Sequence, residues 1–188
     1  MVGNDLVDLK LAAIESNWKR TGYLEKIFST EEQRLIREAN DPSILVWLFW
    51  TMKESAYKVL NRMTGIRSYA PLSLECREVQ IDEFSASGQV WHPYGTFFSS
   101  SVLSKELIHS IAALTAQELF GISVTYHKNV LNYLEDYNQS SVSYSLAKNS
   151  MGLPEIINRE NGITYPASIS HHGRYLAIAH SGSLRSAG

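Results

Sequence analysis

Residues 41–65, DPSILVWLFWTMKESAYKVLNRMTG, contain the pattern that decides the fold. Asp41 is a residue type that caps helices, and Pro42 suits a first helical position. Thr64-Gly65 marks the end of the segment. Between these ends the apolar residues recur at steps of three and four, namely Leu45, Leu48, Phe49, Met52, Ala56, Val59, Leu60 and Met63. This spacing predicts one helix over residues 42–63 with an apolar stripe against the core.

The side of this helix away from the stripe carries Glu54 and Lys58, one turn apart, together with Trp47 and Trp50. Glu and Lys four residues apart commonly form a surface ion pair, which stabilises a helix by about 0.3–0.5 kcal/mol. Two large indoles on a solvated face are harder to explain, because their burial is favourable. We therefore expect another element or a ligand to cover this face.

Residues 1–9, MVGNDLVDL, have the apolar character of a short strand that Asp5 interrupts. A carboxylate in such a segment lies either at an edge in water or against a cation. Asp5 and Glu54 together would supply two carboxylates with no cysteine or histidine beside them, and such oxygen ligands suit Mg²⁺. Magnesium held by so few protein ligands completes its shell with water and phosphate, so the pattern also favours a phosphorylated substrate.

Residues 163–179 predict two strands joined by a polar turn at His172-Gly173. Ser170, His171 and Arg174 stand around this turn and, with His172, offer hydroxyl, imidazole and guanidinium donors to phosphate oxygens. A polar turn that contains histidines is often only a turn, and that alternative stays open for the motif taken alone.

Together, the three stretches resemble the 4'-phosphopantetheinyl transferase superfamily, and their order is that of its holo-acyl-carrier-protein synthase type. Residues 3–9 resemble the N-terminal glycine-x-aspartate motif, and residues 50–58 resemble the tryptophan…lysine-glutamate-x-x-x-lysine helix. Residues 168–171 are similar to the serine-x-serine-histidine strand. Supporting matches are Phe28–Glu32 before the helix and Gly152-Leu153-Pro154 before the histidine motif.

The resemblance implies an α+β fold in which an antiparallel sheet packs against a long helix. It also implies a Mg²⁺-dependent transfer of 4'-phosphopantetheine from coenzyme A to a serine of an acyl or peptidyl carrier protein, with release of adenosine 3',5'-bisphosphate. The resemblance does not distinguish among the carrier proteins of fatty acid, polyketide and nonribosomal peptide synthesis. Two other functions fit the same residues: a magnesium-dependent phosphohydrolase of a nucleotide or coenzyme A, and a catalytically silent module that binds carrier protein or coenzyme A.

The resemblance also assigns roles to residues. Asp5 and Glu54 match the family's metal ligands, and Lys58 matches a lysine that sits over the phosphates or assists deprotonation of the attacking serine. The general base is left open among Glu54, Lys58 and a metal-bound water. Ser170 and His171 match residues that bind coenzyme A phosphates. Further candidates for coenzyme A binding, by charge and position, are Arg174 and Lys53.

The chain departs from the family pattern in two ways: it lacks one acid near the metal site, and it is longer between the helix and the histidine motif, which bears on the assembly. Val7 occupies the position at which larger, two-lobed members carry a further acid, and Asp8 follows one step later, so a third ligand from this strand is doubtful. By analogy with trimeric synthases we expect a homo-oligomer, in which Asp5, Glu54 and Lys58 face the Ser170 and His171 of another copy. In the alternative arrangement, the extra length between the helix and the histidine motif caps the site within a monomer.

The composition of the 188 residues is that of an ordinary soluble domain, with 44% hydrophobic and 19% charged residues. We expect a single domain over residues 1–180 and a flexible tail over residues 181–188. A formal charge of −2 and a pI near 6.3 do not indicate binding to nucleic acid or to an anionic membrane. No apolar run approaches the ~20 residues of a membrane span. The single cysteine, Cys76, excludes an internal disulfide, and a cytoplasmic location is expected.

Docking of an acidic carrier protein would require a local basic patch, since the net charge of the chain is slightly negative. The predicted patch comprises Lys19, Arg20, Lys26, Arg34 and Arg37. The alternative is that these side chains are solvated residues of a helix face.

The remaining elements follow from local signals. Ser29 and Glu32 form a capping-box pattern that opens a helix over residues 30–38. Residues 103–119 fit either a helix or a strand that leads into one, and residues 140–149 predict a helix. Strands are expected over residues 72–81, 88–91, 95–102 and 121–127.

Overall fold

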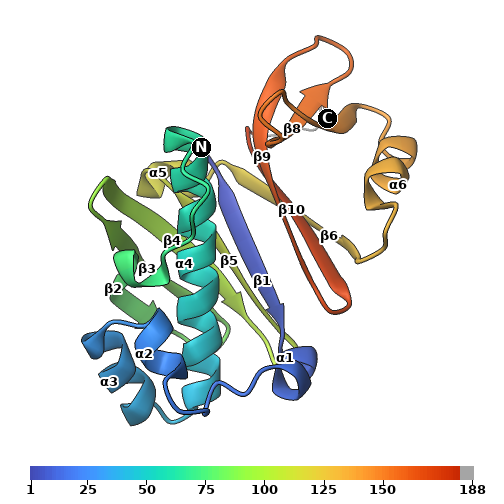
Figure 1. Ribbon diagram of the computed structural model, residues 1–188. Coiled ribbons are helices and arrows are strands. Elements are labelled where there is room, and N and C mark those ends of the chain that lie inside the picture. The colour runs from blue at the N-terminus through green and yellow to red at the C-terminus, as the bar shows by residue number, and fades with distance from the viewer. Residues whose placement is uncertain (183–188) are drawn as a thin grey trace.

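The computed structural model describes residues 1–182 and shows two antiparallel five-stranded sheets with helices (Figure 1). The α+β class and the long helix against a sheet are therefore confirmed. The helices are α1 (Leu9–Glu15), α2 (Tyr23–Ile27), α3 (Thr30–Glu38), α4 (Pro42–Thr64), the 3₁₀ turn η1 (Pro71–Ser73), α5 (Ala116–Leu119) and α6 (Tyr133–Ser140). The strands are β1 (Gly3–Asp8), β2 (Glu75–Ile81), β3 (Ser85–His92), β4 (Gly95–Leu103), β5 (Leu107–Ala113), β6 (Ile122–Lys128), β7 (Tyr144–Lys148), β8 (Pro154–Asn158), β9 (Thr164–His172) and β10 (Tyr175–Ser181).

Helix α4 packs across one face of the first sheet, whose strand order is β1-β5-β4-β3-β2 (Figure 1). The Asp41 carboxylate accepts hydrogen bonds from the N–H groups of Ser43 and Ile44, and Gly65 ends the helix with φ of 74°. The predicted apolar stripe is buried apart from Met63, which is 40% exposed in the last turn. Burial of this stripe against the sheet forms the main hydrophobic core.

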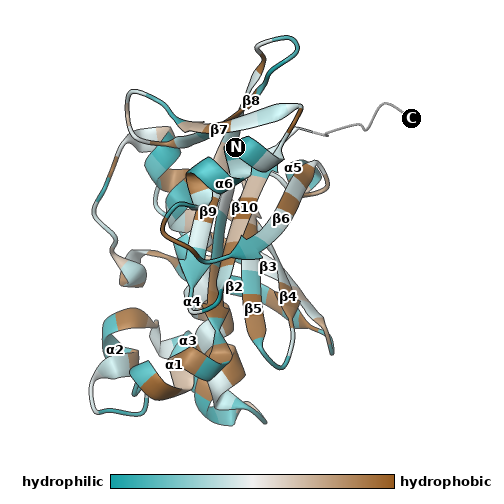
Figure 2. Ribbon diagram, turned by 90° about the vertical axis from the view of Figure 1, so that its right-hand side faces the viewer, coloured by the Kyte–Doolittle hydropathy of each residue, from teal (hydrophilic) through white to brown (hydrophobic). Residues whose placement is uncertain are grey.

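The second sheet has the order β6-β10-β9-β8-β7 and a smaller core of its own. That core contains Leu146, Ile156, Ala167, Leu176 and Ile178, and the apolar residues of α6 pack against it. The remaining residues of α6 are hydrophilic (Figure 2), and of these Asn138 bonds to the backbone of Leu146 while the others are exposed. Strand β1 pairs with β5 in the first sheet and also contacts β9 and β10, so it lies between the two sheets (Figure 1).

The close approach of β1 to α4 depends on Gly3. A Cβ atom at this position would lie 2.0 Å from the backbone oxygen of Ser55, a distance that real side chains do not adopt. Only glycine therefore allows the strand to pass the helix at this depth. Asp5, two residues further on the same face of β1, is thereby brought beside the helix.

The helix predicted over residues 140–149 is wrong. Residues 133–140 form α6, and β7 follows at residues 144–148 as the partner of β8. Leu146 of β7 is buried in the second core, so a tertiary pairing decided this segment against its local preference. The ambiguous residues 103–119 contain strand β5 and the short helix α5.

The other predicted strands are present with shifted ends, and the capping box of α3 is confirmed. The single domain over residues 1–180 stays a prediction. Of the predicted tail, Ser181 ends β10, and residues 183–188 lie outside the described residues.

Lys53 and Glu32 form a buried ion pair that ties α3 to α4. The Lys53 amino group is 2.7 Å from the Glu32 carboxylate and also donates to the backbone oxygens of Ile27 and Pro71. The Glu32 carboxylate accepts a further hydrogen bond from the N–H of Cys76. Both side chains are fully buried, and their hydrogen bonds offset the cost of removing two charges from water.

We predict that Lys53→Met lowers the free energy of unfolding by about 3–5 kcal/mol, because it leaves the Glu32 charge buried without its cation. Lys10→Met is the matched control: Lys10 pairs with Glu106 at the surface, so its loss should cost less than about 1 kcal/mol. Urea denaturation measures both effects. Equal losses in the two variants would contradict a stabilising role for the buried pair.

Candidate functional site

A cleft of about 420 Å³ lies at the free edge of β1, between α4 and the turn that joins β9 to β10. Strand β1 contributes Asp5, Leu6 and Val7, helix α4 contributes Trp47, Trp50 and Glu54, and the end of β9 contributes His171 and His172. Ala12, Ser16 and Tyr23 complete the lining. The two indoles are thus covered by other parts of the chain, as their position on the helix predicted.

Asp5 and Glu54 meet in this cleft, with Lys58 as the adjacent cation. The Lys58 amino group lies 3.0 Å from Asp5 Oδ1 and donates to the backbone oxygen of Asn4 at 2.7 Å. Burial raises the pKa of Asp5, and the charge of Lys58 opposes this rise. Burial and the nearby charge of Asp5 raise the pKa of Glu54 to about 7. The two carboxylates therefore share a site in which ionisation of both is unfavourable without added positive charge.

This donor set fits a hard divalent cation. Two carboxylates that raise each other's cost of ionisation would be stabilised by a bound Mg²⁺, whose remaining ligands are commonly water and phosphate. In residues 1–182, no group of three or more His, Cys, Asp or Glu side chains is arranged to hold a metal. The residues that could hold the ion are Asp5 and Glu54.

Asp8 is committed elsewhere, which agrees with the doubt about a third ligand. Its carboxylate caps α1 by accepting from the N–H groups of Lys10 and Leu11. It also accepts hydrogen bonds from the backbone N–H and the Nε of Arg174, at 3.3 and 3.1 Å. Gly173 packs so closely that a Cβ there would lie 2.5 Å from the Asp8 carboxylate. The turn between β9 and β10 is thus fastened to the start of α1.

The predicted coenzyme A ligands are only partly brought together. His171 is exposed and lines the cleft. Ser170 is buried and accepts a hydrogen bond from the Asn4 carboxamide, so its side chain does not face the cleft. Arg174 is held by Asp8 outside the cleft lining. Lys53 was predicted wrongly as a coenzyme A ligand, because its amino group is buried against Glu32 in the core.

A basic groove that was not predicted from the sequence continues from Lys58 along the end of α4. Two adjoining cavities of about 160 and 390 Å³ share Asn61, Arg62 and Leu153, and the second also reaches Arg67. Arg62 donates to two backbone oxygens of β8 and β9. Arg62 follows Lys58 by four residues, so the helical period was a signal that placed both on one face.

The structure favours the alternative in which the cleft forms within one chain over the expected cleft shared with a neighbouring subunit. Asp5, Glu54 and His171 line one cavity within a single copy. The reason is the connection through β6 and the second sheet, which brings the β9–β10 hairpin back against β1 (Figure 1). The number of copies in the assembly stays a prediction.

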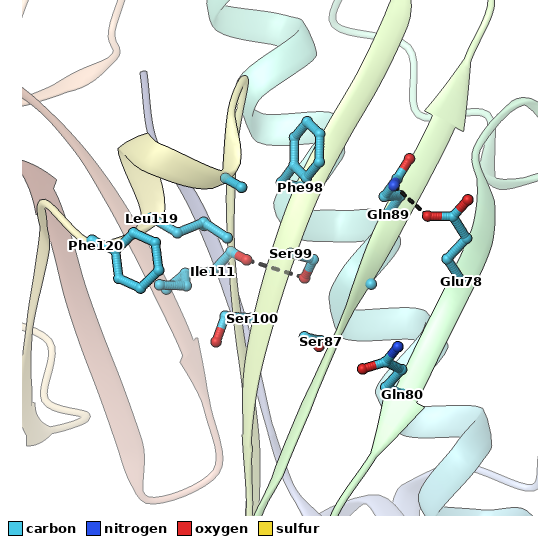
Figure 3. A pocket seen from close by; sticks show the side chains of 12 residues that line it. Glu78, Gln80, Ser87, Gln89, Phe98, Ser99, Ser100, Ile111, Leu119 and Phe120 are labelled. Atoms are coloured by element: carbon cyan, nitrogen blue, oxygen red, sulfur yellow. Dashed lines mark hydrogen bonds between the residues drawn. The ribbon is translucent and has the colours of Figure 1, made fainter.

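Another cavity, of about 480 Å³, lies on the outer face of the first sheet beside α5 (Figure 3). Phe98, Phe120, Glu78 and Gln89 are among its lining residues, and Gln89 donates a hydrogen bond to Glu78. None of the predicted site residues lines it. The chemistry-bearing residues therefore single out the cleft at β1.

Comparison with protein families gives a match to the model of the 4'-phosphopantetheinyl transferase superfamily over residues 1–118. The matched region contains Asp5, Glu54 and Lys58 and ends before the β9–β10 hairpin. A search of curated proteins gives no match. Within residues 1–182, none of the helices combines the length and the apolar character needed to cross a membrane.

We predict that Glu54→Gln stabilises the metal-free protein at pH 8. A carboxyl group whose pKa rises from 4.5 to about 7 on folding destabilises the folded state once it ionises, so this cost grows between those pH values. Removing it should raise the free energy of unfolding at pH 8 by on the order of 1–2 kcal/mol, after allowance for solvent screening, and have little effect at pH 4. Denaturation in EDTA at both pH values measures this.

Addition of Mg²⁺ at pH 8 should make the wild type more stable than Glu54→Gln, because the ion stabilises the wild type more than the variant. Glu160→Gln, the same change in an exposed turn, is the control and should behave as wild type. A pH-independent difference, or an equal response of Glu54→Gln and wild type to Mg²⁺, would remove Glu54 from the metal site.

Proposed function

This chain belongs to the 4'-phosphopantetheinyl transferase superfamily, and we propose that it transfers 4'-phosphopantetheine from coenzyme A to a serine of an acyl or peptidyl carrier protein, in a Mg²⁺-dependent reaction of the holo-acyl-carrier-protein synthase kind. The observation that carries the proposal is the meeting of Asp5, Glu54 and His171 in one cleft, with Lys58 bonded to Asp5. Membership of the superfamily makes a transferase the class of enzyme.

In the proposed reaction, the serine oxygen attacks the pyrophosphate phosphorus that bears the pantetheine arm. The bond from that phosphorus to the bridging oxygen breaks, and adenosine 3',5'-bisphosphate leaves with the electron pair. A bound Mg²⁺ would supply positive charge to the pyrophosphate. Lys58 adds a second positive charge beside Asp5, where negative charge develops on the leaving phosphate. The chain's candidates for accepting the serine proton are Glu54 as carboxylate and, in the alternative in which it is the neutral amine, Lys58.

The basic groove beside Lys58 gives the nucleotide part of coenzyme A a place to bind. Lys58 and Arg62 lie one helical turn apart, about 6 Å along the axis of α4. Arg67 extends the positive charge to the far end of the groove. This spacing suits a substrate with a pyrophosphate and a further phosphate on its ribose, and His171 faces the same pyrophosphate from the other side of the cleft.

The carrier protein would approach over α1 and α2. A groove of about 400 Å³ lined by α1 and the start of α4 adjoins the cleft and shares Ala12, Ser16 and Trp47 with it. Of the predicted basic patch, Arg34 and Arg37 are paired with glutamates of α2 and α3. Lys19, Arg20 and Lys26 form no ion pair with the described part of the chain, so they are the cations offered to an acidic partner.

Mass spectrometry of an apo carrier protein incubated with this protein, coenzyme A and Mg²⁺ tests the proposal. We expect the carrier to gain about 340 Da, the mass of the covalently attached arm. Cleavage of coenzyme A without modification of the carrier would instead indicate a phosphohydrolase. Binding of coenzyme A or carrier with neither reaction would indicate a silent binding module.

In the same assay, Glu54→Gln should abolish transfer while the protein stays folded, because a carboxylate in the cleft contributes little to the core. Glu160→Gln should transfer as well as wild type. Normal turnover by Glu54→Gln would exclude Glu54 from the mechanism.

A mixing experiment tests whether one copy forms the whole site. Asp5→Asn removes a metal ligand, and His171→Ala removes the group from the hairpin. When the two variants are unfolded together, refolded and assayed, we expect only the sum of their separate activities, because each chain retains its own defect. Recovery of substantial activity in the mixture would show that cleft residues come from different copies.

A further inference from the structure

We propose that Asn4 is a positioning residue that holds the β9–β10 hairpin, which carries His171, in place against β1, which carries Asp5. The importance of this placement for transfer rests on the proposed function. Asn4 does not line the cleft and is not among the site residues predicted from the sequence.

Asn4 is fully buried and bonds to the hairpin through both its backbone and its side chain. Its backbone N–H donates to Ser168 Oγ at 3.0 Å, and its carboxamide nitrogen donates to Ser170 Oγ at 3.0 Å. The same nitrogen lies 3.3 Å from the backbone oxygen of Ala177 in β10. Among the described strands, β1 shares a backbone ladder with β5 and none with β9 or β10. Hydrogen bonds of Asn4 take the place of a ladder near the start of β1, and those of Asp8 to His172 and Arg174 do so at its end.

The carboxamide nitrogen of Asn4 has three neighbours for its two hydrogens, and the carboxamide oxygen is buried with no hydrogen-bond partner among the described residues. The oxygen of Ala177 can only accept, so the NH₂ group must face it. The same nitrogen lies 3.2 Å from His109 Nε2, and His109 Nδ1 lies 2.8 Å from the Tyr126 hydroxyl. Burial and the charge of Lys58 lower the pKa of His109 to about 4, which keeps the ring neutral. The network thus joins β1, β5, β6 and the hairpin.

Strand geometry explains how a residue outside the cleft can align it. Successive side chains of a strand point to opposite faces. With Asn4 and Ser170 facing each other in the interior, Asp5 and His171 are the next residues along their strands, and both line the cleft. The backbone oxygen of Asn4 also accepts from Lys58. Asn4 therefore bonds both to the lysine and to the histidine strand, next to the aspartate in sequence.

The test compares Asn4→Ala with Ser101→Ala. Ser101 is also buried in the first sheet and its hydroxyl bonds to Ser110 of β5, so Ser101→Ala matches the loss of a buried hydrogen bond away from those between Asn4 and the hairpin. We expect Asn4→Ala to lower kcat/KM for carrier modification by about 10- to 100-fold through misplacement of His171, and Ser101→Ala to change it less than about twofold. Asn4→Ser, which keeps a short donor, should recover part of the loss and serves if Asn4→Ala does not fold.

Two readouts separate positioning from general destabilisation. Amide hydrogen exchange over residues 164–172 should accelerate by at least about tenfold in Asn4→Ala and stay unchanged in Ser101→Ala. In addition, Asn4→Ala and Ser170→Ala should be strongly non-additive in a double-mutant cycle of unfolding, because each removes the same bond. These two measurements apply even if the protein shows no transfer activity. Equal exchange in the two alanine variants, or full additivity, would overturn the proposal.

Discussion

The contact between β1 and α4 is the constraint on which the rest of the structure depends. Because Gly3 has no side chain, the strand passes within contact distance of the Ser55 carbonyl. The aspartate two residues later then lies beside the lysine and glutamate of α4. A larger residue at position 3 would separate the strand from the helix and with it the two carboxylates. The N-terminal motif therefore combines a steric requirement, at its glycine, with a chemical one, at its aspartate.

The electrostatics of the cleft follow from the same contact. Asp5 and Glu54 are brought into a partly buried site where one lysine is the adjacent cation, so the pKa values of both carboxyl groups are raised. In the core, by contrast, the Glu32 carboxylate receives a lysine and two backbone N–H groups. The two lysines of the helix motif thus have different roles. Lys53 neutralises the buried charge of Glu32, whereas Lys58 is one positive charge beside two carboxylates.

Much of the fold and part of the site could be predicted from the sequence. Helix α4 was predictable because its cap, its stripe and its final glycine agree with one another. Asp5 and Glu54 were predictable because carboxylates are conspicuous where apolar residues would be expected. Lys53 was misassigned because a charged residue next to a site residue gives no local sign of burial, and its partner Glu32 lies 21 residues away.

The second half of the chain was harder to predict for a physical reason. Residues 144–148 form a strand because they pair with β8, and the local spacing of apolar residues does not indicate such a pairing. The same holds for the position of Ser170, whose neighbour in space is the fourth residue of the chain. The resemblance of short motifs identified the family, but the faces on which their side chains lie depend on contacts between distant segments.

The capping of α1 by Asp8 also ties the start of this helix to the turn between β9 and β10. One carboxylate holds the first turn of α1 and also the arginine that follows Gly173. A macromolecule that shifted α1 on binding would thus pull on the loop behind His171. Contact at the surface would in this way be transmitted to the interior of the cleft through Asp8, so that binding of one reactant would alter how the other is held.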